Sequence, residues 1–214
     1  MASDPSSLKL HEITTLRDPH LLDWLDLYES AFPPHGRGAV SWIIRALQAR
    51  EEGRPTHSRL WILCDGAGDF TGMAQTSWNE PYRLTYLGYF AILPERRGQG
   101  LGASFYRLLL PHILTPGPDF LLFDVERPDL LPNPADRELA ARRIRFYERL
   151  GARVLPGATF AWGQARQRLM YHLFAPINEA QILRRATDLV SNFGGRLMKD
   201  DDCESEGTHA RHER

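Results

Sequence analysis

The spacing of apolar side chains predicts that helices and strands are mixed along most of the chain. Apolar residues three and four apart, the spacing of a helix, occur in five segments: residues 18–32, 40–49, 101–112, 133–150 and 178–193. Runs typical of strands cover residues 8–13, 60–64, 70–78, 84–93, 120–126, 152–155 and 168–174. Gly66 and Gly68 separate two of these strands, which predicts a hairpin, and the last two strands are expected to be antiparallel.

The stretch from Arg83 to Leu110 combines a strand, a glycine loop and a helix. Its loop, residues 96–102, holds two arginines followed by three glycines at alternate positions. Glycines allow the backbone to approach a ligand closely with its N–H groups unobstructed. The first turn of the following helix points its positive end the same way. The pattern therefore predicts a site for a phosphate group.

Composition and charge exclude several classes of partner. The formal net charge of −1 over 214 residues gives no support to a nucleic-acid partner. Cys64 and Cys203 are too few for a disulfide framework, which favours a reducing, cytoplasmic location. The first ten residues lack the regions of a signal peptide, and no run approaches the roughly 18 apolar residues of a membrane helix. No membrane partner is expected, and the eight histidines show no metal-site spacing.

Two motifs resemble the GNAT superfamily of acyl-CoA-dependent N-acyltransferases. The family signature, Arg/Gln-x-x-Gly-x-Gly/Ala, is matched by residues 97–102, and residues 146–152 (FYERLGA) are similar to the family's late helix and its exit. With the order of elements, the resemblance covers about residues 8–174. It implies an α/β (α+β) fold with a mixed, mostly antiparallel central sheet of about seven strands, flanked by helices and splayed to form the acyl-CoA slot.

The resemblance also implies a domain organisation. Residues 1–176 would form the N-acetyltransferase domain, and residues 177–195 an appended C-terminal helix that covers the domain or pairs two subunits in a homodimer. Residues 196–214 would form a charged tail, which we expect to be disordered because it contains few large apolar residues.

In the family, acetyl-CoA is the acyl donor, and no metal is implied. The strand before the glycine loop would pair with the pantetheine arm, the loop and helix N–H groups would hold the pyrophosphate, and one strand N–H could bind the oxyanion. Gly88 would mark a bulge that opens the slot. The implied cofactor-binding residues are Phe90, Ala91, Ile92, Leu93, Arg96, Arg97, Gly98, Gln99, Gly100, Leu101, Gly102, Ala103 and Tyr147.

Tyr147 matches the family tyrosine that donates a proton to the leaving thiolate or holds its sulfur. Its helical spacing from Ile144 and Leu150 is equally that of a core aromatic residue. The family often has Asn and Ala seven and four residues before this tyrosine, where this chain has Ala140 and Arg143. The asparagine contact to pantetheine is therefore lost or replaced.

Glu126 is the candidate general base. It ends a buried strand, where open α/β sheets place their ligands, and it shares a face of that strand with Asp124. Two neighbouring carboxylates can raise one pKa towards the range useful for deprotonating an amine. The alternative is a structural carboxylate that pairs with Arg142, Arg143 or Arg145.

The expected acceptor is a primary amine of a small molecule or peptide, bound beneath the first two helices. Candidate contacts there, besides Asp124, are Tyr28, Glu29 and Phe32, followed by His35, Arg37 and Trp42. The sequence does not identify the amine.

Two other functions fit parts of the sequence. Gly98-x-Gly100-x-x-Ala103 matches the pattern of a dinucleotide-binding oxidoreductase, but residues 94–97 separate these glycines from their strand, where a Rossmann turn is immediate. The departures at Ala140 and Arg143 fit a non-catalytic acyl-CoA-binding or interaction module on the same fold.

Overall fold

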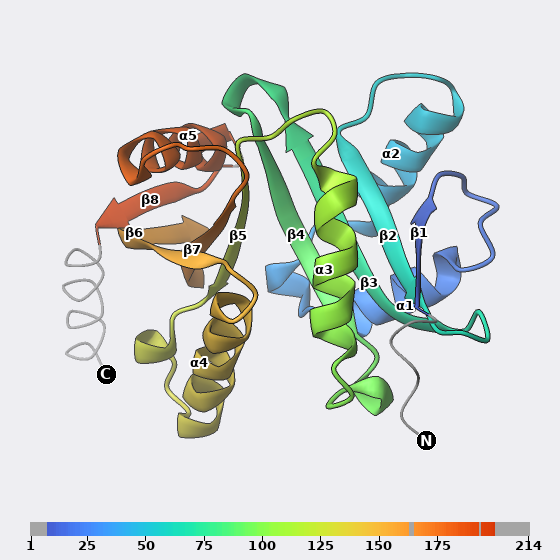
Figure 1. Ribbon diagram of the computed structural model, residues 1–214, viewed down its shortest axis with the longest axis horizontal. Helices are drawn as coiled ribbons and strands as arrows, with labels where there is room; N and C mark the ends of the chain where they lie inside the picture. The colour runs from blue at the N-terminus through green and yellow to red at the C-terminus, as the bar shows by residue number, and fades with distance from the viewer. Residues whose placement is uncertain (1–7, 163–164, 193, 200–214) are drawn as a thin grey trace. The chain divides into compact units, whose positions relative to one another are not determined.

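A computed structural model describes residues 8–162, 165–192 and 194–199 of the chain (Figure 1). The chain folds as two compact units, one within residues 1–79 and 85–118 and the other within residues 80–84 and 119–214. The predicted domain ends at 176 and 195 both fall within the second unit.

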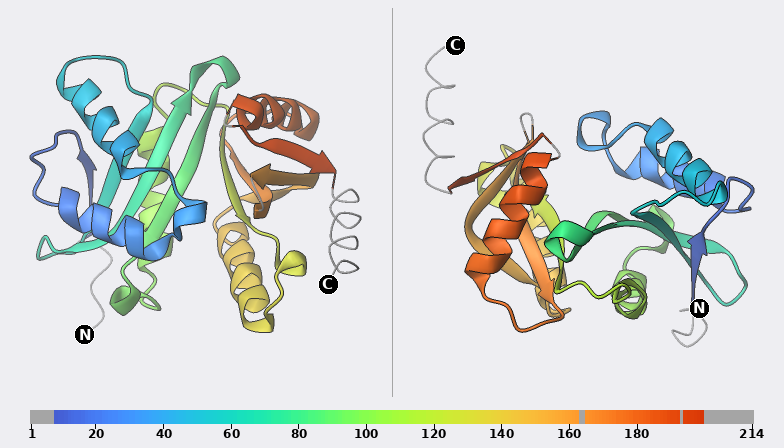
Figure 2. Two further views of the ribbon diagram at one scale, coloured as in Figure 1. Left: turned by 180° about the vertical axis from the view of Figure 1, so that it is seen from behind. Right: turned by 90° about the horizontal axis from the view of Figure 1, so that it is seen from above.

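The first unit is built on strands in the order β1-β2-β3-β4. These are β1 (Lys9–Ile13), β2 (Ser58–Cys64), β3 (Phe70–Asn79) and β4 (Leu84–Ile92), which enters this unit at Thr85. The antiparallel pairing of β2 with β3 confirms the predicted hairpin. Its helices are α1 (Leu21–Ala31), α2 (Val40–Glu51) and α3 (Leu101–Ile113). Helices α1 and α2 cover one face of these strands and α3 the other (Figure 2).

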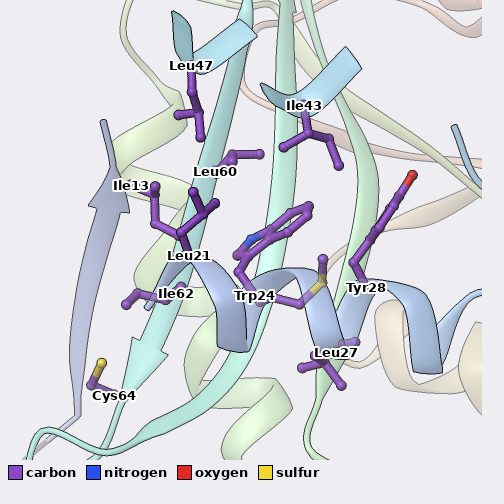
Figure 3. Close-up of a cluster of buried hydrophobic side chains, with 12 residues drawn as sticks. Ile13, Leu21, Trp24, Leu27, Tyr28, Ile43, Leu47, Leu60, Ile62 and Cys64 are labelled. Carbon is purple, nitrogen blue, oxygen red and sulfur yellow. The ribbon is translucent and has the colours of Figure 1, made fainter. Parts of the chain in front are cut away.

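The core beneath α1 and α2 follows the predicted helical spacing. Trp24, Leu27 and Tyr28 of α1 meet Ile43 and Leu47 of α2 over the β-strands (Figure 3). Each is less than 5% exposed. Burying one large apolar side chain contributes about 2 kcal/mol, so this cluster fixes both helices on their strands.

The second unit has strands in the order β5-β7-β6-β8. These are β5 (Phe120–Glu126), β6 (Arg153–Trp162), β7 (Ala165–Leu173) and β8 (Arg196–Lys199), and their pairs are antiparallel. Its helices are α4 (Pro134–Glu148) and α5 (Glu179–Asn192). Asn133 caps α4, because its side-chain oxygen accepts the Ala135 N–H at 2.9 Å.

Helix α5 packs into the second unit and hydrogen-bonds to it. It buries Ile182, Ala186, Leu189 and Val190. Its Arg185 donates to the Asp119 carboxylate at 2.5 Å and to the Tyr82 carbonyl at 3.3 Å. Arg83 binds the same carboxylate at 3.1–3.3 Å. The helix predicted to lie outside the domain core therefore shares a hydrogen-bonded network with the start of β5.

Two elements differ from the sequence prediction. The strand expected to end at Leu155 continues as β6 to Trp162, and the register of its pairing with β7 shifts between Val154 and Thr159, where Pro156 and Gly157 lie. The segment 196–199, assigned to the tail, forms β8 and pairs with β6. Residues 200–214, with Cys203, lie outside the described residues, as do residues 1–7 and Phe193.

The strands and helices together form the predicted mixed α/β fold with a mostly antiparallel sheet. Among the helices that the structure describes, none combines the length and apolar character needed to cross a membrane.

Candidate functional site

The glycine loop between β4 and α3 has a backbone that depends on glycine. After the short 3₁₀ helix η4 (Pro94–Arg96), Gly98 and Gly100 have φ angles of 77° and 79°. This left-handed region is unfavourable for residues with a Cβ atom. A Cβ atom on either glycine would meet no atom within 4 Å. Conformation therefore requires these glycines, and the space beside them is open.

Helix α3 begins at Leu101 with unpaired N–H groups. Within the described residues, the backbone N–H groups of Gly98, Gln99, Gly100, Leu101 and Gly102 have no protein acceptor, whereas those of Ala103 and Ser104 donate to the Gly100 carbonyl. Unpaired N–H groups and the positive end of the helix dipole together favour an anion. The geometry fits the predicted phosphate site.

The two arginines before the glycines have different partners. The Arg96 guanidinium pairs with Asp65, at 2.7 Å, on the turn between β2 and β3. The hydrogen bond from Arg96 holds the pKa of the Asp65 carboxyl below its usual value. Arg97 is exposed and its Nε donates to the Ile92 carbonyl at 3.1 Å. We expected both arginines to contact phosphate, but Arg96 braces a turn, so Arg97 is the better placed of the two.

The end of β4 is held by packing on α3 and by a close approach of β3. The Phe90 ring lies 5.0 Å from that of Phe105. A Cβ atom at Gly72 of β3 would lie 2.8 Å from the Ala91 carbonyl oxygen and 2.6 Å from Ile92 Cδ1. Gly72 is thus needed where the predicted cofactor-binding segment of β4 ends, and the sequence analysis did not single it out.

Gly88 has no comparable steric requirement. A Cβ atom there would meet only ordinary contacts, the nearest with Gln75 Oε1 at 3.6 Å. Its φ angle lies outside the left-handed region. The bulge predicted at this position stays a prediction.

The predicted acceptor residues on α1 have mixed environments. Tyr28 is 1% exposed and belongs to the core. Glu29 is exposed and pairs with Arg37 at 2.8 Å. Phe32 is half-buried and packs edge-on against Tyr89. The side chain of His35 lies outside the described residues, and Trp42 on α2 is 61% exposed.

Tyr147, in the second unit, is a buried phenol on α4. Its ring lies 4.5 Å from that of Phe123 on β5, and its exposed fraction is 6%. Burial raises the pKa of Tyr147; Arg143 works against this shift, and Asp124 and Glu126 add to it. The phenol is therefore neutral at physiological pH.

Glu126 ends β5 and forms an ion pair with Arg143 of α4. Both side chains are less than half exposed, at 43% and 40%. The predicted pairing of Glu126 with an α4 arginine is therefore present, which favours the structural alternative for this carboxylate. Because Arg143 and Tyr147 are one turn apart on α4, the pair lies beside the buried phenol.

The structure distributes the predicted residues between the two units. The glycine loop, the end of β4 and the acceptor candidates Tyr28, Glu29 and Phe32 belong to the first unit, whereas Asp124, Glu126 and Tyr147 belong to the second. The predicted acyl-CoA slot would need one strand from each unit and stays a prediction.

A surface cavity of about 570 Å³ in the first unit was not predicted. It is lined by Asp23, Asp26, Leu27, Ser30, Phe70, Leu93, Pro94 and Glu95. Its lining joins residues of α1 to those that precede the glycine loop, a proximity that has no signature in the sequence. Across the described residues, no group of three or more His, Cys, Asp or Glu side chains is arranged to hold a metal ion.

The sequence matches the model of the acetyltransferase (GNAT) family over residues 21–127. No curated protein matches it. Among solved structures, a putative acetyltransferase from the GNAT family of Bacteroides thetaiotaomicron is 20% identical with a TM-score of 0.56, covering 82% of this chain and 92% of that one.

Structures of Vibrio cholerae enzymes are similar as well. The spermidine/spermine N-acetyltransferase SpeG, solved in complex with manganese ions, is 15% identical with a TM-score of 0.56 and coverages of 85% and 98%. A dodecameric spermidine N-acetyltransferase is 14% identical with a TM-score of 0.58 and coverages of 84% and 98%. At these identities the similarity shows a shared fold.

Proposed function

Because this chain belongs to the acetyltransferase (GNAT) family, we propose that it transfers an acetyl group from acetyl-CoA to a primary amine by direct nucleophilic attack. The observation that carries this proposal is the glycine loop, where five successive N–H groups have no acceptor in the described part of the chain and two glycines adopt left-handed backbone. A pyrophosphate is the acetyl-CoA group that suits such a row of donors.

Residues of the first unit would hold the cofactor. The N–H groups at residues 98–102 would bind the pyrophosphate, with a charge-assisted contact from the exposed Arg97. The backbone of residues 90–93 would pair with the pantetheine arm, and one of its N–H groups would stabilise the oxyanion of the tetrahedral intermediate. Gly72 would hold this end of β4 close to β3, because a Cβ atom there would clash with the Ala91 carbonyl oxygen.

Tyr147 would supply the proton that the leaving group needs. When the amine attacks the thioester carbon, a C–N bond forms, the C–S bond breaks and the thiolate of coenzyme A leaves. The neutral phenol, kept protonated by burial, donates its proton to that thiolate.

Glu126 would accept the proton that the attacking ammonium must lose. Its ion pair with Arg143 occupies the carboxylate, so proton transfer would require this pair to open or a water molecule to relay the proton. The same pair supports a second candidate function, a non-catalytic acyl-CoA-binding module, because it occupies the carboxylate with a structural partner.

The acceptor is proposed as a primary amine of a small molecule or peptide. The spermidine acetyltransferases among the structural neighbours support an amine, and the dodecameric neighbour supports oligomerisation, such as a homodimer. The small number of cysteines supports a cytoplasmic location.

The test is release of coenzyme A from acetyl-CoA over a panel of primary amines, with acetyl-CoA binding measured in parallel by calorimetry. Turnover with at least one amine supports the enzyme. Binding without turnover on any amine supports the non-catalytic module, and the absence of binding contradicts both.

A second comparison tests the base. Glu126→Gln should lower turnover by about tenfold, whereas Glu148→Gln, an exposed carboxylate on the same helix as Arg143, should leave it unchanged. Equal rates for the two variants would contradict the role assigned to Glu126.

A further inference from the structure

We propose that Tyr89 is a positioning residue for the amine acceptor, because Tyr89 and Tyr28 together clamp Gly38 and so tie the segment between α1 and α2 to β4. This inference rests on the proposed function, which assigns the backbone next to Tyr89 to the acyl donor. The term Gly38 clamp is used below for these three residues.

Both backbone groups of Gly38 are bound by tyrosine hydroxyls. The Gly38 N–H donates to the Tyr89 hydroxyl oxygen at 2.8 Å, and the Tyr28 O–H donates to the Gly38 carbonyl at 2.8 Å. The two backbone groups of Gly38 are therefore tied to α1 through Tyr28 and to β4 through Tyr89.

Aromatic packing holds the two hydroxyls in place. The Tyr28 and Tyr89 rings meet edge-on with centroids 4.7 Å apart and planes at 90°. Phe32 packs against both rings, with its centroid 6.1 Å from that of Tyr28 and 4.9 Å from that of Tyr89. Because Tyr28 is 1% exposed, the clamp reaches from the core of the first unit to the segment at residues 32–39.

The segment at residues 32–39 depends on the clamp because its other contacts leave a buried hydrogen-bond donor without an acceptor among the described residues. Arg37 pairs with Glu29 and lies over the Tyr28 ring, yet its Nε–H is buried and has no acceptor among the described residues. A buried unpaired donor is costly. On the other side of Gly38, a Cβ atom would lie 3.0 Å from Cε3 of Trp42, so the segment is also fitted closely against the start of α2.

The position of Tyr89 on β4 links the clamp to both proposed substrates. Phe90, the first residue assigned to the acyl donor, follows directly in the chain, and the clamped segment joins α1 to α2, beneath which the acceptor is expected. The clamp fixes where an amine held by this segment lies relative to the donor strand. Among the described residues no hydrogen bond or ring contact joins these three residues to the glycine loop, so acetyl-CoA binding should not depend on the clamp.

The experiment compares Tyr89→Phe with Tyr171→Phe in the full chain. Each substitution removes one buried or half-buried tyrosine hydroxyl; that of Tyr171 binds Glu179 in the second unit. Tyr89→Phe should accelerate hydrogen exchange at the Gly38 amide by about tenfold or more, because that amide loses its acceptor. It should raise the KM for an amine identified in the panel by about tenfold, with kcat and the Kd for acetyl-CoA changed less than about twofold. Tyr171→Phe should change none of these quantities.

Each result decides part of the proposal. Unchanged exchange at Gly38 in Tyr89→Phe would overturn the clamp. Faster exchange with an unchanged amine KM would overturn the positioning role. A panel without turnover would overturn the proposed function and with it the role towards the acceptor, whereas the exchange experiment would still decide whether the clamp exists. Gly38→Ala, which displaces the segment through Trp42, should raise the amine KM in the same way.

Discussion

The two units of this chain build their candidate chemistry from different parts of the polypeptide. In the first unit the backbone provides the site: N–H groups at residues 98–102 and the end of β4. In the second unit side chains provide it, through the buried Tyr147 and the ion pair of Glu126 with Arg143.

This difference predicts which substitutions each site tolerates. A backbone site tolerates exchange of most side chains but not of the glycines that shape it, whereas a side-chain site is lost with a single functional group. Substitutions in the glycine loop should therefore change the affinity for acetyl-CoA, whereas substitutions at the functional side chains of the second unit should change turnover or stability.

The largest expected effect is that of Tyr147→Phe on turnover. Removing the proton donor should lower kcat by about 100-fold, the lower end of the range for general acid catalysis, with acetyl-CoA affinity unchanged. Steady-state coenzyme A release and calorimetry measure the two quantities, and Tyr171→Phe is the control for loss of a buried hydroxyl. Full activity in Tyr147→Phe would leave Tyr147 as a core aromatic residue only.

Asp119→Asn should be the next largest change, and it should act on stability. The variant weakens charge-assisted bonds from Arg83 and Arg185, which should lower the free energy of unfolding by about 2 kcal/mol. Denaturant titration measures this loss. Asp188→Asn, an exposed carboxylate on α5, is the matched control and should be neutral.

The same variant tests a pH dependence. The hydrogen bonds from Arg83, and to a smaller extent from Arg185, lower the pKa of Asp119. Burial of the carboxyl raises this pKa, but the two arginines outweigh it. A carboxylate with a lowered folded-state pKa contributes stability above its unfolded pKa of about 4, and the contribution is lost as pH falls through the folded value. Asp119→Asn should therefore reduce the loss of stability below about pH 4, and identical acid titrations for both proteins would contradict this assignment.

Gly100→Ala should weaken acetyl-CoA binding by about tenfold, because the left-handed backbone costs about 1–2 kcal/mol with a Cβ atom and the N–H groups turn away. Gly53→Ala is the control for backbone strain outside the cofactor site. Gly53 has a φ angle of 69°, and a Cβ atom there would meet nothing within 4 Å. The two variants should lose similar stability, but only Gly100→Ala should lose affinity in calorimetry.

The smallest expected effect is that of Arg97→Gln, about a threefold loss of acetyl-CoA affinity at low salt, because exposed charge contacts contribute less than about 1 kcal/mol. The loss should shrink as salt is added. Arg107→Gln removes an exposed arginine of α3 and should have no effect. A Kd for Arg97→Gln equal to that of the unmodified chain at every salt concentration would argue against a contact.

The sequence predicted the glycine loop and most helices and strands well, because short local patterns of residues encode them. Alternate glycines after a strand predicted the loop, and the glycine motif together with the FYERLGA motif indicated the family that the family model confirms. Apolar spacing located most helices and strands. The same local rules placed the end of a strand at Leu155, seven residues before the end of β6, and they missed β8, whose four residues RLMK are too few to show a period.

Partnerships between distant residues could not be predicted. Nothing in the neighbourhood of Arg96 indicates that it pairs with Asp65, and the choice of Arg143 among the α4 arginines as the partner of Glu126 depends on the angle at which the helix packs. Gly72 was missed for the same reason, because its requirement arises from the Ala91 carbonyl oxygen of a neighbouring strand.

Strand β8 has a consequence for the solubility of shortened forms of this protein. Its residues pair with Ala158–Ala161 of β6. Without β8, these residues of β6 would form an edge strand with unpaired backbone N–H and C=O groups. Exposed edge strands pair with other chains and promote aggregation. A form that ends at residue 195 would leave this edge of β6 unpaired, so shortened forms of the protein should retain the chain at least through Lys199.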